Sequence, residues 1–191
     1  RGGTGWRGTA SAVAVGVMAL LGADSARYNY TPVPRASETL STGRRPSWCP
    51  DRVPTVTLRE IGPDIEDAVS ALRVAPGQQR FVATMAQSFY DAVDEPEQNA
   101  WMRAVVADGI PVGFVMVSWN IVPVPGELWG PYYLWRLLID AEHQRRGYGA
   151  AAVGLVVDAV RADGADALLT SCVTGEGSPQ PFYEGLGFVP T

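Results

Sequence analysis

The chain has 191 residues, of which 47% are hydrophobic, so we expect one domain with a substantial core. Its formal charge of −5 argues against nucleic acid as the main partner, because nucleic-acid-binding surfaces are basic, and favours small cationic substrates. Two cysteines, Cys49 and Cys172, fit neither a disulfide framework nor a paired-cysteine zinc site. The single histidine, His143, excludes a multi-histidine metal site, so we expect no metal and a solvated His143.

The first 52 residues differ in composition from the rest, being rich in Gly, Ser, Pro and Arg. Residues 10–23 are an apolar stretch that follows Arg1 and Arg7, as in the core of a signal peptide, and they are short for a membrane span. We predict that residues 1–52 are a disordered or adventitious extension, with residues 31–54 as a flexible tether. A working signal, and hence a secreted or membrane-tethered domain, is the alternative.

Regular structure is predicted from Thr55 onward. Residues 56–58 form a short strand, and Pro63 lies in the first turn of a helix that carries an apolar stripe. A second helix begins near Thr84, where Gln87 completes the spacing of a capping box. The stripe of the first helix consists of Ile65, Ala68, Val69 and Leu72.

The middle of the chain is rich in β-forming residues. Residues 101–107 and 112–119 are predicted to pair as a hairpin through the turn at residues 108–111, and residues 132–139 form the next strand. A helix over residues 151–160, a strand at Ala167–Val173 and a short last helix at residues 179–186 complete the series. The predicted order is β-α-α-β-β-β-α-β-α, an α/β fold with a mixed sheet.

A glycine-rich run at residues 144–150 joins the predicted 132–139 strand to the following helix. Backbone N–H groups at a helix start, beside arginines and glycines, form a binding place for a pyrophosphate. The run lacks the Gly-Lys-Ser/Thr of a P-loop. A dinucleotide fingerprint traced over Gly147, Gly149 and Ala152 lacks a well-spaced acidic residue after the next strand, since the nearest is Glu176.

The run at residues 144–150 matches the Q/R-x-x-G-x-G/A signature, and residues 181–188 resemble the last block of the GNAT superfamily of N-acetyltransferases. Together with the element order, these two motifs identify residues 53–191 as a GNAT domain by resemblance. The resemblance implies one more strand after the Gly-Phe of this block, and we expect that strand to be missing here. We therefore expect either a truncated chain or a neighbouring subunit, as in a homodimer, that completes the sheet.

The resemblance implies direct transfer of an acetyl group from acetyl-CoA to a small-molecule amine in a ternary complex, in the cytoplasm. Four stretches, residues 80–83, 111–116, 134–140 and 175–179, look like the diamine and spermine/spermidine acetyltransferase-like branch, which adds di- and polyamines to the expected acceptors. A non-catalytic acyl-CoA-binding domain that acts as a sensor or in protein interaction is the alternative.

The resemblance also implies roles for individual residues. Tyr183 matches the residue that protonates the departing CoA thiolate. Backbone groups of the 132–139 strand bind the pantetheine arm, one N–H stabilises the oxyanion, and the glycine-rich run binds the pyrophosphate. The expected cofactor-binding residues are Leu138, Ile139, Gln144, Arg145, Arg146, Gly147, Tyr148, Gly149 and Ala150.

The acceptor site is less defined by the sequence. Trp135 and Tyr133 present aromatic faces for a cationic substrate, with core packing as the favoured alternative for Trp135, and Glu127 is a further candidate. Because strand residues alternate, Trp135 and Arg136 are expected on opposite faces, with Arg136 near a partner carboxylate or the cofactor. The general base stays open. Its candidates by location are Glu127, Asp140 and Glu142, and Phe182, Leu186 and Cys172 are expected in the core.

Overall fold

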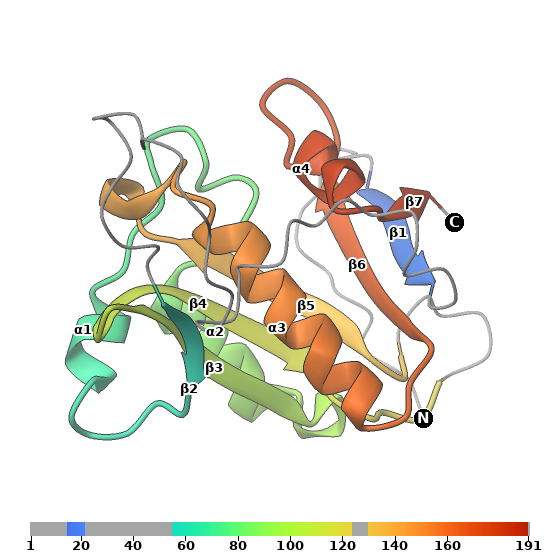
Figure 1. The fold of residues 1–191 in the computed structure, drawn as a ribbon, viewed down its shortest axis with the longest axis horizontal. Helices are drawn as coiled ribbons and strands as arrows, with labels where there is room; N and C mark the ends of the chain where they lie inside the picture. Colours follow the sequence, from blue (N-terminus) through green and yellow to red (C-terminus); the bar gives the residue numbers. More distant parts are fainter. Residues whose placement is uncertain (1–14, 22–54, 124–129, 191) are drawn as a thin grey trace, which may run out of the picture.

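The computed structural model describes residues 15–21, 55–123 and 130–190 (Figure 1). Within them, seven strands form one sheet: β1 (Val15–Leu21), β2 (Val56–Arg59), β3 (Ala100–Ala107), β4 (Ile110–Ser118), β5 (Tyr133–Ile139), β6 (Ala167–Val173) and β7 (Val189–Pro190). The α-helices are α1 (Glu66–Ser70), α2 (Met85–Asp94), α3 (Tyr148–Ala162) and α4 (Gln180–Gly185), and two short 3-10 helices are η1 (Pro96–Gln98) and η2 (Ala141–His143).

The strands lie in the order β2-β3-β4-β5-β6-β1-β7. Only β5 and β6 are parallel neighbours, and every other adjacent pair is antiparallel. From β2 onward the elements follow the predicted order β-α-α-β-β-β-α-β-α, so the mixed α/β fold is confirmed. None of the helices in these described segments is long and apolar enough to cross a membrane.

The β3–β4 hairpin turns through two residues, Asp108 and Gly109, where four were predicted. Their φ angles of 49° and 86° are both left-handed, which is the geometry of the tight turns that suit the twist of a hairpin. Ile110 and Pro111 consequently belong to β4, and Ala107 pairs with Ile110.

The cap predicted for α2 and the apolar stripe predicted for α1 are each confirmed in part. The Thr84 hydroxyl accepts a hydrogen bond from the Gln87 N–H at 3.2 Å, as a cap at the start of α2 requires. The Gln87 side chain does not return to Thr84 and instead donates to Asp91 at 2.6 Å. The first helix, α1, is shorter than predicted, and Ala68 of its expected stripe is exposed while the other three members are buried.

Strand β4 is buried on both sides, because helices cover each face of the sheet. Val115 and Val117 pack against α3, whose buried residues include Val153 and Val156. Met116, which alternates with them along the strand, packs on the opposite face in a cluster with residues of α1 and α2. Figure 1 shows α3 lying along one face of the sheet. The two core clusters meet at β5, which carries the candidate site.

Strand β1 lies within the predicted N-terminal extension. It pairs with β6 over seven residues, from Val15↔Val173 to Leu21↔Ala167, and with β7 through Met18 and Ala19. The prediction of a disordered extension is therefore wrong for these residues, and the rest of residues 1–52 lies outside the described segments. Past the Gly-Phe of the last block, where a strand was expected to be missing, the chain forms the short strand β7, which pairs with β1, and β1 in turn lies along β6.

Candidate active site

Strands β5 and β6 diverge after two paired positions. The parallel ladder contains only Tyr133↔Leu169 and Leu134↔Thr170, although both strands continue for several residues. Figure 1 shows the two strands running apart toward α4 and the loop that precedes α3. Among the described residues, the backbone of β5 beyond Leu134 therefore has no strand partner on its β6 side, so its polar groups there need other partners.

A β-bulge lies where the divergence begins. Met116 pairs with Arg136 but Val117 pairs with Leu134, so Trp135 is an extra residue in β5. A bulge bends its strand and increases the local twist, which explains why β5 leaves β6 at this point. The bulge also breaks the alternation of side chains. Trp135 packs in the α1/α2 cluster and Arg136 pairs with Asp91 of α2, so the prediction that these two residues face opposite sides is wrong.

Beyond the bulge, the backbone of Ile139 faces the gap between β5 and β6. The Asp140 N–H donates to the Val112 carbonyl at 2.9 Å, and alternate residues of an antiparallel strand turn to opposite sides. The polar groups of Leu138 therefore face β4 and those of Ile139 face away from it. The Gln144 amide donates to the Ile139 carbonyl at 3.0 Å, which fixes the start of the glycine-rich run to the end of β5.

The glycine-rich run ends at the N-terminus of α3. Gly147 is the N-cap and has a φ of 81°, and a side chain there would meet no atom within 4 Å, so the glycine serves the backbone conformation and leaves open space. The N–H groups of Tyr148, Gly149 and Ala150 belong to the first turn, where an α-helix leaves its donors without helical partners. The Tyr148 side chain is buried in the core, so its contribution to a ligand is through the backbone.

Two arginines at this helix start are exposed, as binding to a pyrophosphate requires. Arg146 donates to the Glu142 carbonyl at 3.0 Å, and Arg145 has a left-handed φ of 62°. Their guanidinium groups and the helix N-terminus add positive charge at one place in a chain of net negative charge. The glycine-rich run therefore combines N–H donors, positive charge and open space.

Tyr183 of α4 lies at the apex of the divergence. Its side chain is 7% exposed, and burial raises the pKa of its phenol to about 12, while a hydrogen bond with Thr170 acts in the opposite direction. Thr170 is the last residue of β6 that pairs with β5, and its hydroxyl donates to the Leu134 carbonyl at 3.1 Å. A phenol with this pKa keeps its proton at neutral pH.

Three residues near Tyr183 were predicted to lie in the core: Phe182 of α4, Leu186 at its C-cap and Cys172 of β6. Leu186 packs against the core as predicted. Phe182 was expected in the core and is 37% exposed, so that prediction is wrong. A Cβ added to Gly149 would lie 3.3 Å from the Phe182 ring, which shows that α4 reaches the start of α3 across the gap. Cys172 is buried as expected, and burial raises the pKa of its thiol.

The aromatic residues proposed for the acceptor site are mostly enclosed. Tyr133 is 4% exposed, its hydroxyl lies 2.5 Å from that of Ser171, and burial raises the pKa of its phenol. The Trp135 ring packs in the α1/α2 cluster, which agrees with the core alternative, and the Arg136 guanidinium carbon lies 5.3 Å from its centroid. Glu127 lies outside the described residues.

The carboxylates considered as general bases have different surroundings. Asp140 accepts backbone N–H bonds with both oxygens, from Glu142 at 3.0 Å and from Arg73 at 2.9 Å, so it organises the loop. Glu142 is exposed. His143 is half-buried rather than solvated, and its Nδ1 is buried without a hydrogen-bond partner among the described residues.

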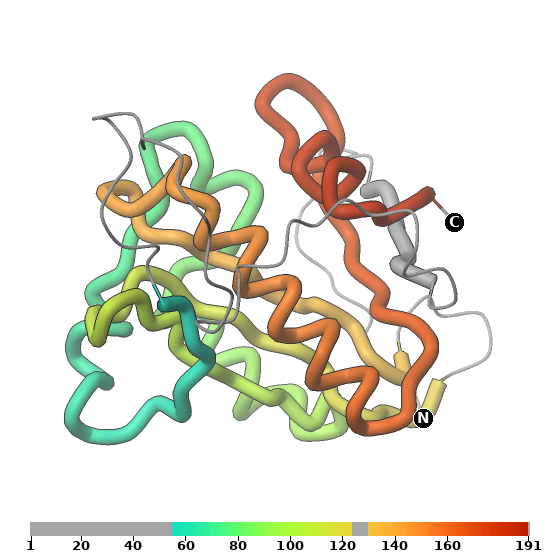
Figure 2. The backbone as a smooth tube through the Cα atoms, in the orientation of Figure 1, coloured from blue at the N-terminus to red at the C-terminus, as the bar shows by residue number. Residues whose placement is uncertain are grey.

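A segment between α1 and α2, residues 73–81, connects the two sides of the gap and was not anticipated. Gln78 accepts a hydrogen bond from Gln144 at 2.7 Å on the side of the glycine-rich run. Arg80 donates to the Glu176 carbonyl in the loop between β6 and α4. The backbone of this segment can be followed between those two loops in Figure 2. No periodic pattern in the sequence marks such a connection.

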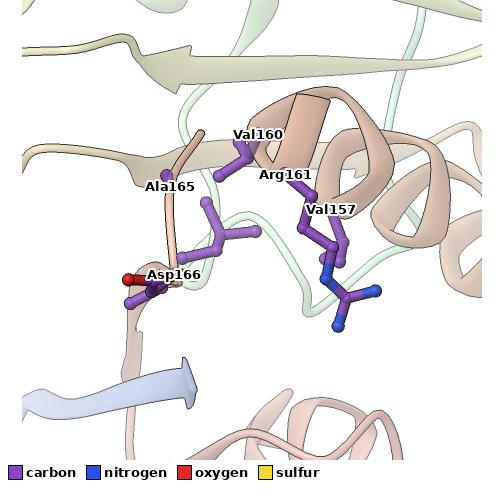
Figure 3. Close-up of a pocket in the computed structure, with 7 residues that line it drawn as sticks. Val157, Val160, Arg161, Ala165 and Asp166 are labelled. Atoms are coloured by element: carbon purple, nitrogen blue, oxygen red, sulfur yellow. The ribbon is translucent and has the colours of Figure 1, made fainter. Parts of the chain in front are cut away.

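Two hollows lie away from the gap. One, between the end of α3 and the start of β6, has a volume of about 10 Å³, which is room for about one water molecule (Figure 3). The other measures about 440 Å³ and is lined by Glu60, Ile61, Glu66, Phe89, Ala100, Met102 and Arg103, on the β2–β3 half of the sheet. Within the described segments, no group of three or more His, Cys, Asp or Glu side chains is placed to bind a metal ion.

Comparison with known proteins identifies the family. The acetyltransferase (GNAT) family model matches residues 65–188, which is more than half of the chain. A solved structure, the GCN5-related N-acetyltransferase from Sphaerobacter thermophilus, is 14% identical with a TM-score of 0.46, covering 93% of this chain and 48% of that one. This chain thus spans about half the length of that protein. No curated protein sequence matches it. On the strength of the family match, the chain belongs to the GNAT family of acetyltransferases.

Proposed function

We propose that the chain transfers an acetyl group from acetyl-CoA to a primary amine of a small molecule, by direct attack within a ternary complex. The observation that carries this proposal is the position of Tyr183. Its protonated phenol lies beside Thr170, where β5 and β6 separate, and the glycine-rich run lies at the far end of the same gap. The glycine-rich run and the Tyr183 phenol thus flank a stretch of β5 that has no β6 partner.

The donor fits the residues that line this gap. The first-turn N–H groups of α3, with Arg145 and Arg146, would bind the pyrophosphate. The Ile139 backbone, which faces away from β4, would pair with the pantetheine arm. The open space beside Gly147 leaves room for phosphate oxygens against the backbone. The thioester end would then lie toward the bulge and Tyr183.

The chemistry is an aminolysis. The amine nitrogen attacks the thioester carbonyl, a C–N bond forms, the C–S bond breaks, and the electron pair leaves with sulfur. The nitrogen loses one proton and the sulfur gains one. A thiol has a pKa of about 8.5, well below that of Tyr183, so the phenol stabilises the developing thiolate chiefly as a hydrogen-bond donor. A backbone N–H at the end of β5 would stabilise the oxyanion.

The acceptor is proposed to be a small amine, with di- and polyamines as the first class to test. The stretches that resemble the polyamine branch support this choice, and so does the net charge of −5, since an acidic protein attracts cations. We place the reaction in the cytoplasm, where acetyl-CoA is available. The competing function is a non-catalytic acyl-CoA sensor.

Replacement of Tyr183 separates an enzyme from a sensor. The chain should be assayed with acetyl-CoA against polyamines, amino acids and aminoglycosides, with released CoA detected as free thiol. For an enzyme, Tyr183→Phe should lower kcat by roughly 100-fold or more while CoA affinity stays within about twofold. Wild-type chain that binds CoA but acetylates no amine of the panel would contradict the enzyme proposal and favour the sensor.

Tyr132 provides a matched control for this substitution. It is also buried, at 5% exposed, and a hydrogen bond to Asp163, together with burial, raises the pKa of its phenol to about 12. Asp163 lies at the C-terminal end of α3, away from the glycine-rich run. Tyr132→Phe should therefore change stability but not kcat. An equal loss of kcat in both variants would mean that Tyr183 acts only through packing.

A further inference from the structure

We propose that Arg136, held by Asp91, is a positioning residue that fixes the β5 bulge and so keeps β5 and β6 apart for the donor. The inference rests on the proposed function, because it assumes that CoA binds in this gap. It assigns a role to the one charged side chain of β5, which the motifs of the sequence leave unexplained.

The contacts of Arg136 bracket the bulge. One guanidinium nitrogen donates to the carbonyl of Trp135, the extra residue of the bulge, at 3.0 Å, and the other lies 2.8 Å from the Asp91 carboxylate in α2. A bulge leaves a residue outside the regular ladder, and its backbone groups need other partners. A single planar group thus satisfies a bulge carbonyl and connects it to a helix.

The geometry limits what can replace this side chain. Only a guanidinium presents several N–H donors in a fixed fork, so it can serve the carbonyl and the carboxylate in one orientation. The Arg136 and Asp91 side chains are 20% and 16% exposed, so water competes weakly for either. The Arg136 Nε is buried without a hydrogen-bond partner in the described residues, so the two contacts at the other nitrogens determine the orientation.

The acidic groups around Arg136 favour a positively charged side chain at this position. The groups that act on it or with it are Asp91, Glu95 and the Tyr133 phenol. Burial is the main cause that raises the pKa of Glu95, nearby Asp91 and Glu97 raise it further, and Arg136 lowers it. Arg136 likewise lowers the pKa of Tyr133 against the larger effect of burial. Loss of the guanidinium would leave two carboxylates close together beside the bulge, that of Asp91 in α2 and that of Glu95 at the C-cap of the helix.

An ordinary stabilising ion pair would make the same contacts without affecting the gap, and the chain offers a matched control for that alternative. Arg103 of β3 donates to the carbonyl of the preceding residue, Met102, at 2.8 Å, lies 3.2 Å from the Glu60 carboxylate, and stacks 4.4 Å over the Trp101 ring. It thus repeats the contacts of Arg136, but in a strand that is not adjacent to the gap.

The experiment compares Arg136→Met with Arg103→Met by isothermal titration of CoA and by thermal unfolding. We expect Arg136→Met to weaken CoA binding by about tenfold, the effect of losing roughly one backbone hydrogen bond between β5 and the donor. Arg103→Met should lower Tm and leave CoA affinity within about twofold. If Arg136→Met does not fold, Arg136→Lys serves in its place, since it keeps the charge opposite Asp91 but cannot form the fork, and we expect it to weaken CoA binding as well.

A charge reversal distinguishes positioning from stability. The double variant Arg136→Asp with Asp91→Arg restores an ion pair between β5 and α2, but position 136 can no longer donate to the Trp135 carbonyl. We expect a Tm above that of Arg136→Asp alone without recovery of CoA affinity. Full recovery of CoA affinity, or equal affinities in Arg136→Met and Arg103→Met, would overturn the inference while the proposed function stands. Failure of the wild-type chain to bind CoA would instead refute the proposed function and this inference with it.

Discussion

Substitution of Gly113 by alanine tests whether β4 and β5 need their close approach. A Cβ at this position would lie 2.5 Å from the Leu138 carbonyl oxygen and 2.7 Å from the Ile139 Cδ1 atom. The nearer atom belongs to the backbone and cannot rotate away, so β5 must shift. Overpacking of this kind costs about 1–3 kcal/mol of unfolding free energy. At about 2–4 °C per kcal/mol for a chain of this size, a loss of about 2 kcal/mol lowers Tm by roughly 4–8 °C.

Gly185 is the matched control. It lies in α4, its φ is not left-handed, and a Cβ there would meet no atom within 4 Å. Gly185→Ala should be neutral or stabilise by up to about 1 kcal/mol, because alanine favours the helix. Urea unfolding followed by circular dichroism measures both variants, with unchanged m-values as the check that the transitions are comparable. A Gly113→Ala variant within about 0.5 kcal/mol of wild type would refute the steric argument.

Three further predictions concern stability. Deletion of residues 1–21 should lower Tm because β6 loses its partner β1, and a synthetic peptide of residues 13–23 added in excess should raise it again. A peptide without effect would contradict the pairing. Thr84→Ala should cost about 1 kcal/mol in urea unfolding, because α2 loses its cap, whereas Thr84→Ser should cost much less. Unfolding free energy should fall between about pH 10 and pH 12, since Tyr132 and Tyr183 have pKa values raised to about 12 in the fold and bind protons more tightly there than in the unfolded chain. Tyr132→Phe should make this decline shallower in urea titrations across the range, and an unchanged slope would count against the assignment.

The order of elements from β2 to α4 followed from periodicity and turn chemistry because these signals are local. Asp108-Gly109 specifies a tight turn whatever surrounds it, and Thr84 caps a helix through contacts within one turn. The glycine-rich run was recognisable for the same reason, since its residues act together within one short segment. Local chemistry thus predicted the fold and the donor end of the candidate site.

The parts that were missed depend on residues distant in sequence. The bulge at Trp135 arises from how β5 pairs with β4, and an alternating pattern read from one strand cannot show an extra residue. A carboxylate partner was one of two expectations for Arg136, but its identity as Asp91 required the packing of α2 on β5. Phe182 was assigned to the core because hydrophobicity alone does not tell which face of a short helix reaches a neighbouring loop.

The position of β1 has a consequence for the order in which the chain folds. Its pairs with β6 join residues roughly 150 positions apart, from Val15↔Val173 to Leu21↔Ala167, and its pairs with β7 join residues still farther apart, so β1 closes the longest loops among the described strands. Synthesis proceeds from the N-terminus, and residues 15–21 therefore leave the ribosome well before their partner strand is made. The β3–β4 hairpin, in contrast, needs only its own turn. We expect β1 to dock late, together with β7, which pairs with it, and until then this apolar strand is open to pairing with another chain.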